Sequence, residues 1–464
     1  MYKNNVWGEK MLIKKKIIAF CVLFFSAYGL FMFGKAQAAE KPSDSQNSAI
    51  KKDNGSVAKA ELPTPYHWNI SKDVNINFAG YVQANAYGVH KSKASFGTGT
   101  VDRPFDTYFN RVYLAAYGGI FNYKYFMVYN FASRGSHPSN GLIWAWLSHS
   151  LGPGTLFVGQ HWNYSSMEEP VSSAKLMFIG RNFNSSSGIT SLFNHDQGLF
   201  YQISTPYGNK KNNIFWGVSA YSLNNTISHR NPAPGYGVNT ALEWAPVVTD
   251  RLWYQFGATY VHARTFGDTA LASVTPFYAG ARQPAQIIAY YPNSQALADP
   301  TKNQVQVNFA GSFGSLFLLG EYGMAIYSQK NNHTDHVQAY SVQAGYWLTG
   351  EVTPFDPKIA SYGLPVPIHK YGAIDVVAGY DRISNLDINN KNVGAGRCIP
   401  TATTPSFDPS KITKCNVESY RLAANYYINP MMRFTVQVTK SIADLGNAGK
   451  DDPWEYEAQA QWEF

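Results

Sequence analysis

The sequence is poor in charged residues and, after residue 39, has no long apolar run. Asp, Glu, Lys and Arg make up 15% of the chain, against about 25% in a typical soluble enzyme. No segment after residue 39 offers the roughly 20 apolar residues of a transmembrane helix, and the mean hydropathy is negative. A helical membrane protein and an ordinary soluble α/β enzyme are therefore both disfavoured.

Motifs of known catalytic chemistry are missing as well. The sequence contains no Walker loop, no G-x-S-x-G, no H-E-x-x-H and no C-x-x-C. The 11 histidines are scattered along the chain. We expect no enzyme activity, no catalytic residues, no cofactor and no metal site.

The N-terminus has the layout of a secretory signal peptide. A lysine cluster precedes an apolar run over 17–34, and small residues follow at 36–39. This pattern predicts a leader over 1–39, with Met1 or Met11 as its start. The alternative is an uncleaved membrane anchor, because the apolar run is long.

Loss of this leader changes the charge and the cysteine count. Residues 1–39 hold six Lys and one Glu, so the formal charge of +8 falls by 5 to +3. The basic character thus belongs largely to the leader, and we expect no nucleic-acid partner. Cys398 and Cys415 remain, and an even pair in an exported protein suggests a disulfide, with two free thiols as the alternative.

Aromatics are abundant at 15%, and hydrophobicity alternates along most of the chain. Residues 40–65 are polar and read as a flexible periplasmic lead-in, whereas 66–464 reads as a series of short strands. Segments of about ten alternating residues are the signature of an outer-membrane β-barrel. We predict sixteen strands, near 74–89, 107–119, 122–133, 141–150, 155–161, 197–205, 213–223, 235–245, 251–263, 303–312, 316–329, 336–349, 370–384, 417–428, 431–442 and 454–464.

A soluble β-sandwich or β-helix with one buried face is the alternative, and two features disfavour it. The apolar faces of the strands end in Tyr, Trp and Phe, as expected at the two membrane interfaces. Short connections also alternate with long ones, which include 162–196, 264–302 and 385–416. Bacterial barrels have short periplasmic turns and long external loops. The connection at 350–369 breaks this rule because it is long for a turn, and the connection after 316–329 is short for an external loop.

The final strand, WEYEAQAQWEF, alternates to the end of the sequence. Its aromatics and alanines share one parity, predicted to face lipid, and its Glu and Gln share the other. An unpaired strand edge in lipid leaves backbone groups unsatisfied, so this strand should pair with the first one. A terminal aromatic strand also resembles the signal that the outer-membrane barrel-assembly machinery recognises.

Several stretches resemble the phosphate-selective porin O/P family. They are TYFNRVYLAAYGGIFNYKYFMVYNFA, LFVGQHWNYSSMEEPVSSAKLMFIGRNF, NHDQGLFYQIS, GYWLTGEVTPFDP and YYINPMMRFTVQV. The resemblance implies an outer-membrane barrel of about 16 antiparallel strands, a homotrimer, and an inward-folded loop that constricts the pore. It also implies that the long turn at 350–369 tucks into the barrel, and that lumen cations give an anion preference.

The sequence departs from that family in its cations. Arg111 is kept, but Asn110 and Tyr113 occupy positions where further arginines are common, and Gly180 replaces a familiar Glu before Arg181. A fixed cationic ladder attracts anions, so strong phosphate selectivity is not expected. The candidate pore-lining and constriction residues are Arg111, Arg134, Glu168, Glu169, Lys175, Arg181, Arg421 and Arg433, each of which could instead form a wall salt bridge.

These observations predict a porin for passive diffusion of small ions and polar solutes, with at most a weak anion preference. The expected partners are outer-membrane lipid, lipopolysaccharide and small anionic or polar solutes. The alternative function is a surface adhesin or structural protein that acts through its long loops.

Overall fold

The computed structural model describes residues 66–90, 103–132, 141–186, 195–206, 211–223, 235–265, 277–278, 286–291, 301–328, 334–387, 397–399 and 408–464. All of them belong to one compact unit, Lys59–Phe464. The predicted leader and lead-in lie outside the described residues. None of the helices in the described part of the chain is long and apolar enough to cross a membrane.

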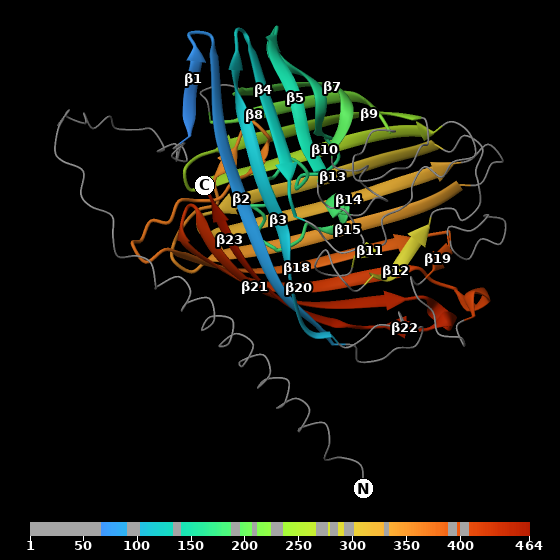
Figure 1. Cartoon of the computed structure of the whole chain (residues 1–464). Coiled ribbons are helices and arrows are strands. Elements are labelled where there is room, and N and C mark those ends of the chain that lie inside the picture. Colours follow the sequence, from blue (N-terminus) through green and yellow to red (C-terminus); the bar gives the residue numbers. More distant parts are fainter. Residues whose placement is uncertain are drawn as a thin grey trace. The chain divides into compact units, whose positions relative to one another are not determined.

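Sixteen antiparallel strands form a closed β-barrel (Figure 1). The strands of its first half are β2 (Val74–His90), β3 (Arg103–Ile120), β4 (Tyr123–Asn130), β5 (Gly141–Leu151), β6 (Gly154–Trp162), β7 (His195–Pro206), β8 (Asn213–Ser222) and β9 (Gly235–Val248). Those of the second half are β10 (Leu252–Thr265), β13 (Thr301–Phe313), β14 (Leu316–Ser328), β15 (Thr334–Trp347), β18 (Ala373–Asn385), β20 (Asn416–Asn429), β21 (Met432–Asp444) and β23 (Trp454–Glu463). Every predicted strand corresponds to one of them.

Shorter elements complete the described chain. They are β1 (His67–Ser71), α2 (Phe183–Ser186), β11 (Phe277–Tyr278), β12 (Gln286–Tyr291), β16 (Phe355–Asp356), β17 (Ser361–Tyr362), β19 (Arg397–Ile399), η2 (Pro409–Lys411), η3 (Gly446–Ala448) and β22 (Lys450–Asp451). The sequence did not predict β1, which pairs with the start of β2.

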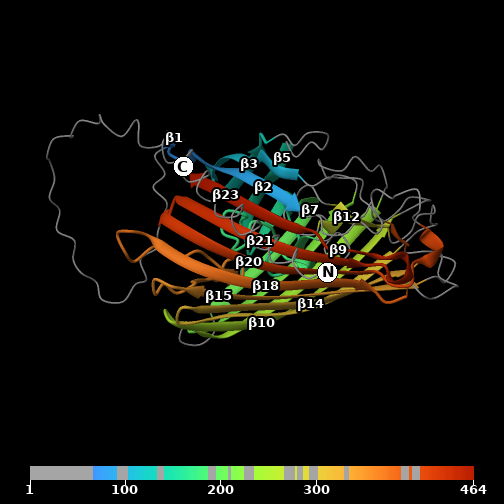
Figure 2. The ribbon, with the colours of Figure 1, turned by 90° about the horizontal axis from the view of Figure 1, so that it is seen from below.

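The barrel closes where the last strand pairs with the first, as predicted. Figure 2 shows β23 between β2 and β21. The register runs from Tyr81 opposite Glu463 to His90 opposite Trp454. The Phe464 amide donates to the Gly80 carbonyl at 2.9 Å, and the Gly80 amide donates to the Phe464 carbonyl at the same distance. No backbone edge is left at this seam.

The two faces of the wall follow the alternation in the sequence, because successive strand side chains point to opposite sides. On β13, Val305 and Val307 are about half exposed, whereas Gln304 and Gln306 are fully buried. On β20, Tyr420 and Leu422 are exposed and Arg421 is buried. The predicted outward apolar face and inward polar face are confirmed at these positions.

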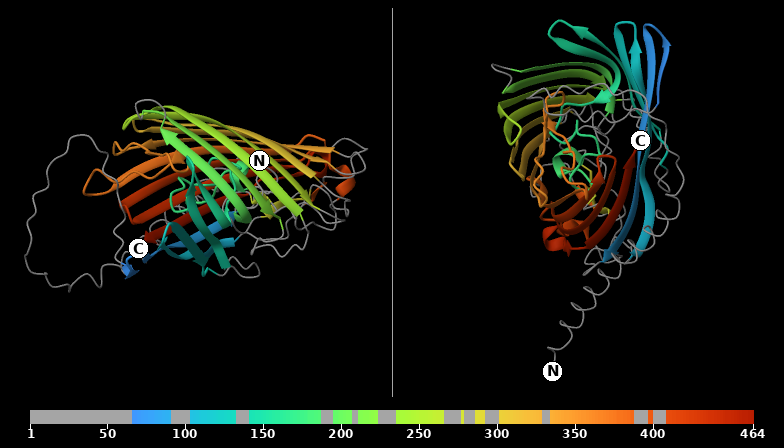
Figure 3. Two further views of the ribbon diagram at one scale, coloured as in Figure 1. Left: turned by 90° about the horizontal axis from the view of Figure 1, so that it is seen from above. Right: turned by 90° about the vertical axis from the view of Figure 1, so that its left-hand side faces the viewer.

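Two connections lie against the inner face of the barrel. One is residues 163–186, between β6 and β7, which we call the 163–186 segment. The other is residues 348–372, between β15 and β18, which we call the 348–372 turn. In the right-hand view of Figure 3 the green 163–186 segment lies within the ring of strands.

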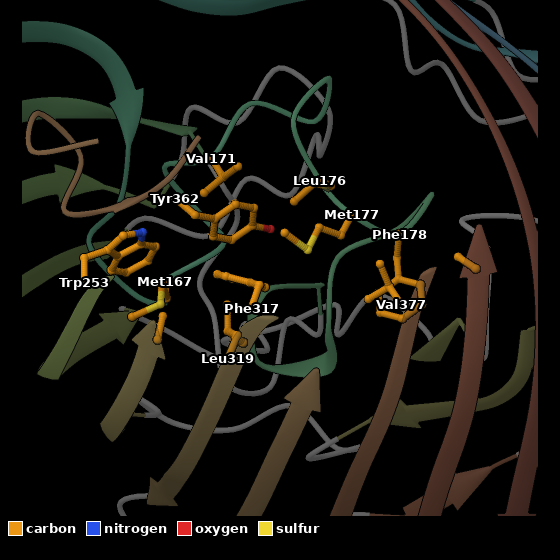
Figure 4. Close-up of a cluster of buried hydrophobic side chains, with 12 residues drawn as sticks. Met167, Val171, Leu176, Met177, Phe178, Trp253, Phe317, Leu319, Tyr362 and Val377 are labelled. Carbon is orange, nitrogen blue, oxygen red and sulfur yellow. The ribbon is translucent and has the colours of Figure 1, made fainter. Parts of the chain in front are cut away.

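An apolar cluster joins these two connections to the wall. In Figure 4, Tyr362 of the 348–372 turn lies among Val171 and Met177 of the 163–186 segment and Phe317 of β14. The Tyr362 and Phe317 rings are 4.9 Å apart between centroids. Burial of such side chains contributes roughly 1.5–3 kcal/mol each, which helps to hold both connections inside the barrel.

Candidate pore interior

The 163–186 segment is fixed to the inner wall by side chains of strands far apart in the sequence. The Met167 amide donates to Glu321 of β14 at 2.6 Å, and the Ile179 amide donates to Gln437 of β21 at 2.9 Å. Gln461 of β23 donates to the Ala174 carbonyl at 3.0 Å. The segment therefore lies against the inward polar face of much of the barrel.

Glu168 links this segment to the wall and to the 348–372 turn. Its Oε1 accepts from Gln343 Nε2 at 2.7 Å and from the Tyr362 hydroxyl at 3.2 Å, and its Oε2 accepts from the Asn182 amide at 2.8 Å. Burial, and next the Glu168 carboxylate, raise the pKa of Tyr362 well above its usual value. The Tyr362 phenol therefore stays neutral and donates to the carboxylate. We call this three-donor site the Glu168 anchor.

The 348–372 turn reaches the wall independently. Trp253 Nε1 of β10 donates to the Thr353 carbonyl at 2.6 Å, and Gln255 Nε2 donates to the Ala360 carbonyl at 2.7 Å. Ser361 Oγ donates to the Met167 carbonyl at 3.1 Å. This connection is longer than an ordinary barrel turn because it enters the barrel, as the family resemblance implied. The bonds above hold it there.

Arg421 and Arg433 lie on the inner face of the wall, and both bind the 163–186 segment. Arg421 Nη1 donates to the Gly180 carbonyl at 3.0 Å, and its Nη2 is 2.7 Å from Asp381 Oδ2. Arg433 Nη1 donates to the Leu176 carbonyl at 2.6 Å. Both arginines therefore orient backbone carbonyls, in addition to contributing positive charge.

The other predicted residues occupy different parts of the interior. Arg111 is buried, and its Nη1 donates to Gln83 Oε1 at 2.9 Å. Arg181 is half-buried and donates to the carbonyls of Glu168 and Val171 within its own segment, at 3.0 and 2.7 Å. Lys175 is half-buried and Glu169 is buried. Arg134 lies outside the described residues.

Both cations and carboxylates surround the 163–186 segment. Ser173 Oγ lies 2.6 Å from the Tyr81 hydroxyl of β2, on the wall that carries Arg111. The other end of the segment contacts Glu321 and Asp381 of β14 and β18. The described interior thus carries charges of both signs and is not a one-sign ladder.

The structure also reveals contacts that the sequence did not single out. Asn182, Gln343 and Tyr362 complete the Glu168 anchor, although each looks like an ordinary polar or aromatic residue in its segment. Cys415 is buried and disulfide-bonded. The side chain of Cys398 lies outside the described residues, so the pairing of these two cysteines stays a prediction.

Comparison with known proteins decides the family. The family model described as phosphate-selective porin O and P matches residues 83–464. This chain belongs to that family. Membership places the protein among the porins of the outer membrane and confirms the resemblance inferred from the sequence motifs.

Solved structures of outer-membrane proteins are similar at low identity. An in-vitro folded OmpT of Vibrio cholerae, in its trimer form, is 12% identical with a TM-score of 0.48, covering 83% of this chain and 99% of its own. The anion-selective porin from Comamonas acidovorans is 10% identical with a TM-score of 0.48, covering 84% and 99%. The DcaP channel of Acinetobacter baumannii is 11% identical with a TM-score of 0.48, covering 84% and 97%. No curated protein matches the sequence closely.

Proposed function

We propose that this porin forms a water-filled channel for passive diffusion of small ions and polar solutes across the outer membrane. Its family membership, together with a closed barrel whose inner face is polar, supports this proposal most strongly. The 163–186 segment is proposed to narrow the channel, because it lies inside the barrel and is bonded to the wall. No enzymatic role is proposed.

We further propose a weak anion preference. Arg111, Lys175 and Arg181 lie around one part of the 163–186 segment, and fixed charge in a narrow channel raises the local concentration of counter-ions. Carboxylates of the interior, among them Glu168 and Glu169 of the same segment, oppose this effect, so the preference should be modest. Export through a cleaved signal peptide, assembly as a homotrimer and contact with lipopolysaccharide remain predictions.

The test is a planar-bilayer recording of the refolded full barrel. Discrete conductance steps are expected, and silence across many insertions would overturn the channel function and favour the adhesin alternative. A reversal potential in a KCl gradient then gives the ion preference. We expect Lys175→Ala to move this potential toward cation preference, and Lys370→Ala to leave it unchanged, because Lys370 is exposed in the 348–372 turn.

Ionic strength provides an independent check of the same proposal. The Debye length shortens from about 10 Å at 0.1 M to about 3 Å at 1 M salt. Selectivity due to fixed charges should therefore shrink as KCl is raised at a constant concentration ratio. An anion preference that does not change with salt would contradict this assignment of the charged residues.

A further inference from the structure

Aromatic side chains line the inner face of neighbouring strands in the first half of the barrel. In register, Tyr117 of β3 is opposite Phe126 of β4, and Phe126 is opposite Trp146 of β5. The Phe126 and Trp146 rings stack with centroids 5.6 Å apart, and Tyr117 lies 6.2 Å from Phe126. Trp144 extends this group at 5.2 Å from Phe126. We call these four residues the aromatic row.

The aromatic row faces the interior of the barrel. Tyr113 has the same parity as Tyr117 on β3 and lies 4.8 Å from Tyr81, whose hydroxyl contacts Ser173 of the 163–186 segment. Residues of the opposite parity, such as Met127 and Leu147, are exposed on the outer surface. The aromatic row is therefore separate from the belts of aromatics that face lipid.

The same wall already accepts aromatic rings where the chain covers it. Beyond the row, the inward rings of Phe200 and Phe215 are buried. Tyr164 of the 163–186 segment lies 5.7 Å from Phe215, and its ring occupies the space that a Cβ on Gly217 would need. At Gly217, a glycine beside inward-facing rings thus leaves room for a flat side chain.

The row itself adjoins Gly159 of β6, which is directly opposite Trp146 in register. A Cβ on Gly159 would lie 2.3 Å from the Ala145 carbonyl oxygen, so β5 and β6 approach closely at this point. Phe157 and His161 flank Gly159, with ring centroids 5.0 and 5.8 Å from that of Trp146. All four rings of the row are only partly buried, in contrast to the buried rings beneath the 163–186 segment.

Charge is nearly absent from this part of the wall. Lys124 is the only Lys, Arg, Asp or Glu within β4, β5 and β6. In contrast, β14, β18 and β20 carry Glu321, Asp381 and Arg421 on their inward faces. A neutral solute is therefore suited to the aromatic row, whereas ions are suited to the charged wall.

We propose that the aromatic row is a binding track for neutral saccharides. A pyranose ring has an apolar C–H face that stacks on aromatic rings, and a hydroxyl rim that needs polar partners. The hydroxyl of Tyr117 and the inward Ser148 and Thr155 lie along the same wall as the rings. The proposal rests on the channel function and adds the class of solute that the lumen retains.

The test measures how sugars block the ion current of the refolded channel. Maltotriose should reduce the current reversibly and with saturation, whereas sorbitol, a neutral polyol without a ring, should reduce it only in proportion to its effect on bulk conductivity. In Trp146→Ala the half-blocking concentration should rise roughly two- to tenfold. Trp146→Phe should retain most of the block because it retains a ring.

Matched variants and probes separate the outcomes. Trp244 is an exposed tryptophan of β9. Maltotriose should block the current of Trp244→Ala as it blocks that of the wild type, so this variant controls for loss of a tryptophan. Absence of any conductance would refute the channel function itself. Normal conductance with equal effects of maltotriose and sorbitol would refute only the saccharide track, as would a block that benzoate produces and maltotriose does not.

Discussion

Arg421 and Asp381 form a buried ion pair beside the 163–186 segment, and removing it should weaken the attachment of the segment to the wall. The two side chains are 4% and 1% exposed, and their charged atoms are 2.7 Å apart. The Arg421 guanidinium also lies over the Phe178 ring, 4.2 Å from its centroid, and donates to the Gly180 carbonyl. One side chain thus joins β18 and β20 to the segment inside the barrel.

Arg421→Ala should lower the free energy of unfolding by about 3–5 kcal/mol, the usual cost of removing one partner of a buried pair. The cost arises because Asp381 stays buried without its cation and the Gly180 carbonyl loses its donor. The measurement is a reversible urea titration of the barrel in phospholipid vesicles, followed by tryptophan fluorescence. Bilayer recordings of the same variant should show more current noise as the segment loosens.

The chain supplies a matched control on the same two strands. Arg382 of β18 and Glu418 of β20 pair on the outer face at 3.4 Å, with side chains 31% and 24% exposed. Arg382→Ala should cost about 0–1 kcal/mol, as partly exposed pairs do. If Arg421→Ala costs no more than Arg382→Ala, the reasoning fails.

A double mutant refines the result. Asp381→Asn in the Arg421→Ala background removes the uncompensated carboxylate. The two changes should therefore cost less together than the sum of their separate costs. Strict additivity would show that the pair does not couple in the folded barrel.

Two further predictions concern the Glu168 anchor and a strained glycine. Tyr362→Phe removes one donor to the Glu168 carboxylate and should cost about 1.5–3 kcal/mol, seen in urea titrations and as increased current noise; a silent variant would show that the turn does not depend on this bond. Gly159→Ala should cost about 1–3 kcal/mol or more, since Gly159 has φ of 125° and its new Cβ would lie 2.3 Å from the Ala145 carbonyl oxygen. Gly320→Ala is the control, because its new Cβ would lie 4.0 Å from its nearest neighbour, the Ser341 carbonyl oxygen; equal folded yields for both variants would refute the steric argument.

Much of the barrel wall could be predicted because the sequence pattern that specifies it is local. A period of two sets which side chains face lipid, and it persists through strands such as Met432–Asp444. The turn at Asn429 and the pairing of the last strand with β2 follow from this pattern, since a membrane barrel leaves no open edge. The short strand β1 was missed because HWNIS carries only a weak alternation.

The interior could be predicted only in part. Sequence parity indicated that Arg421 and Arg433 face inward, but it could not identify the backbone carbonyls that they bind. Glu168 was recognised as a loop carboxylate, whereas its donor Tyr362 lies 194 residues further along the chain. No local pattern relates two such positions.

By itself, the sequence determined the strands, their faces, the closure of the barrel and the family, because these depend on alternation and on motifs that are contiguous in the chain. The tertiary structure decided what the inward side chains meet. Strand pairing brings distant inward residues together around the 163–186 segment and the 348–372 turn. It also assembles the rings of β3, β4 and β5 into one aromatic row, since register across strands, and not spacing along one strand, makes them neighbours.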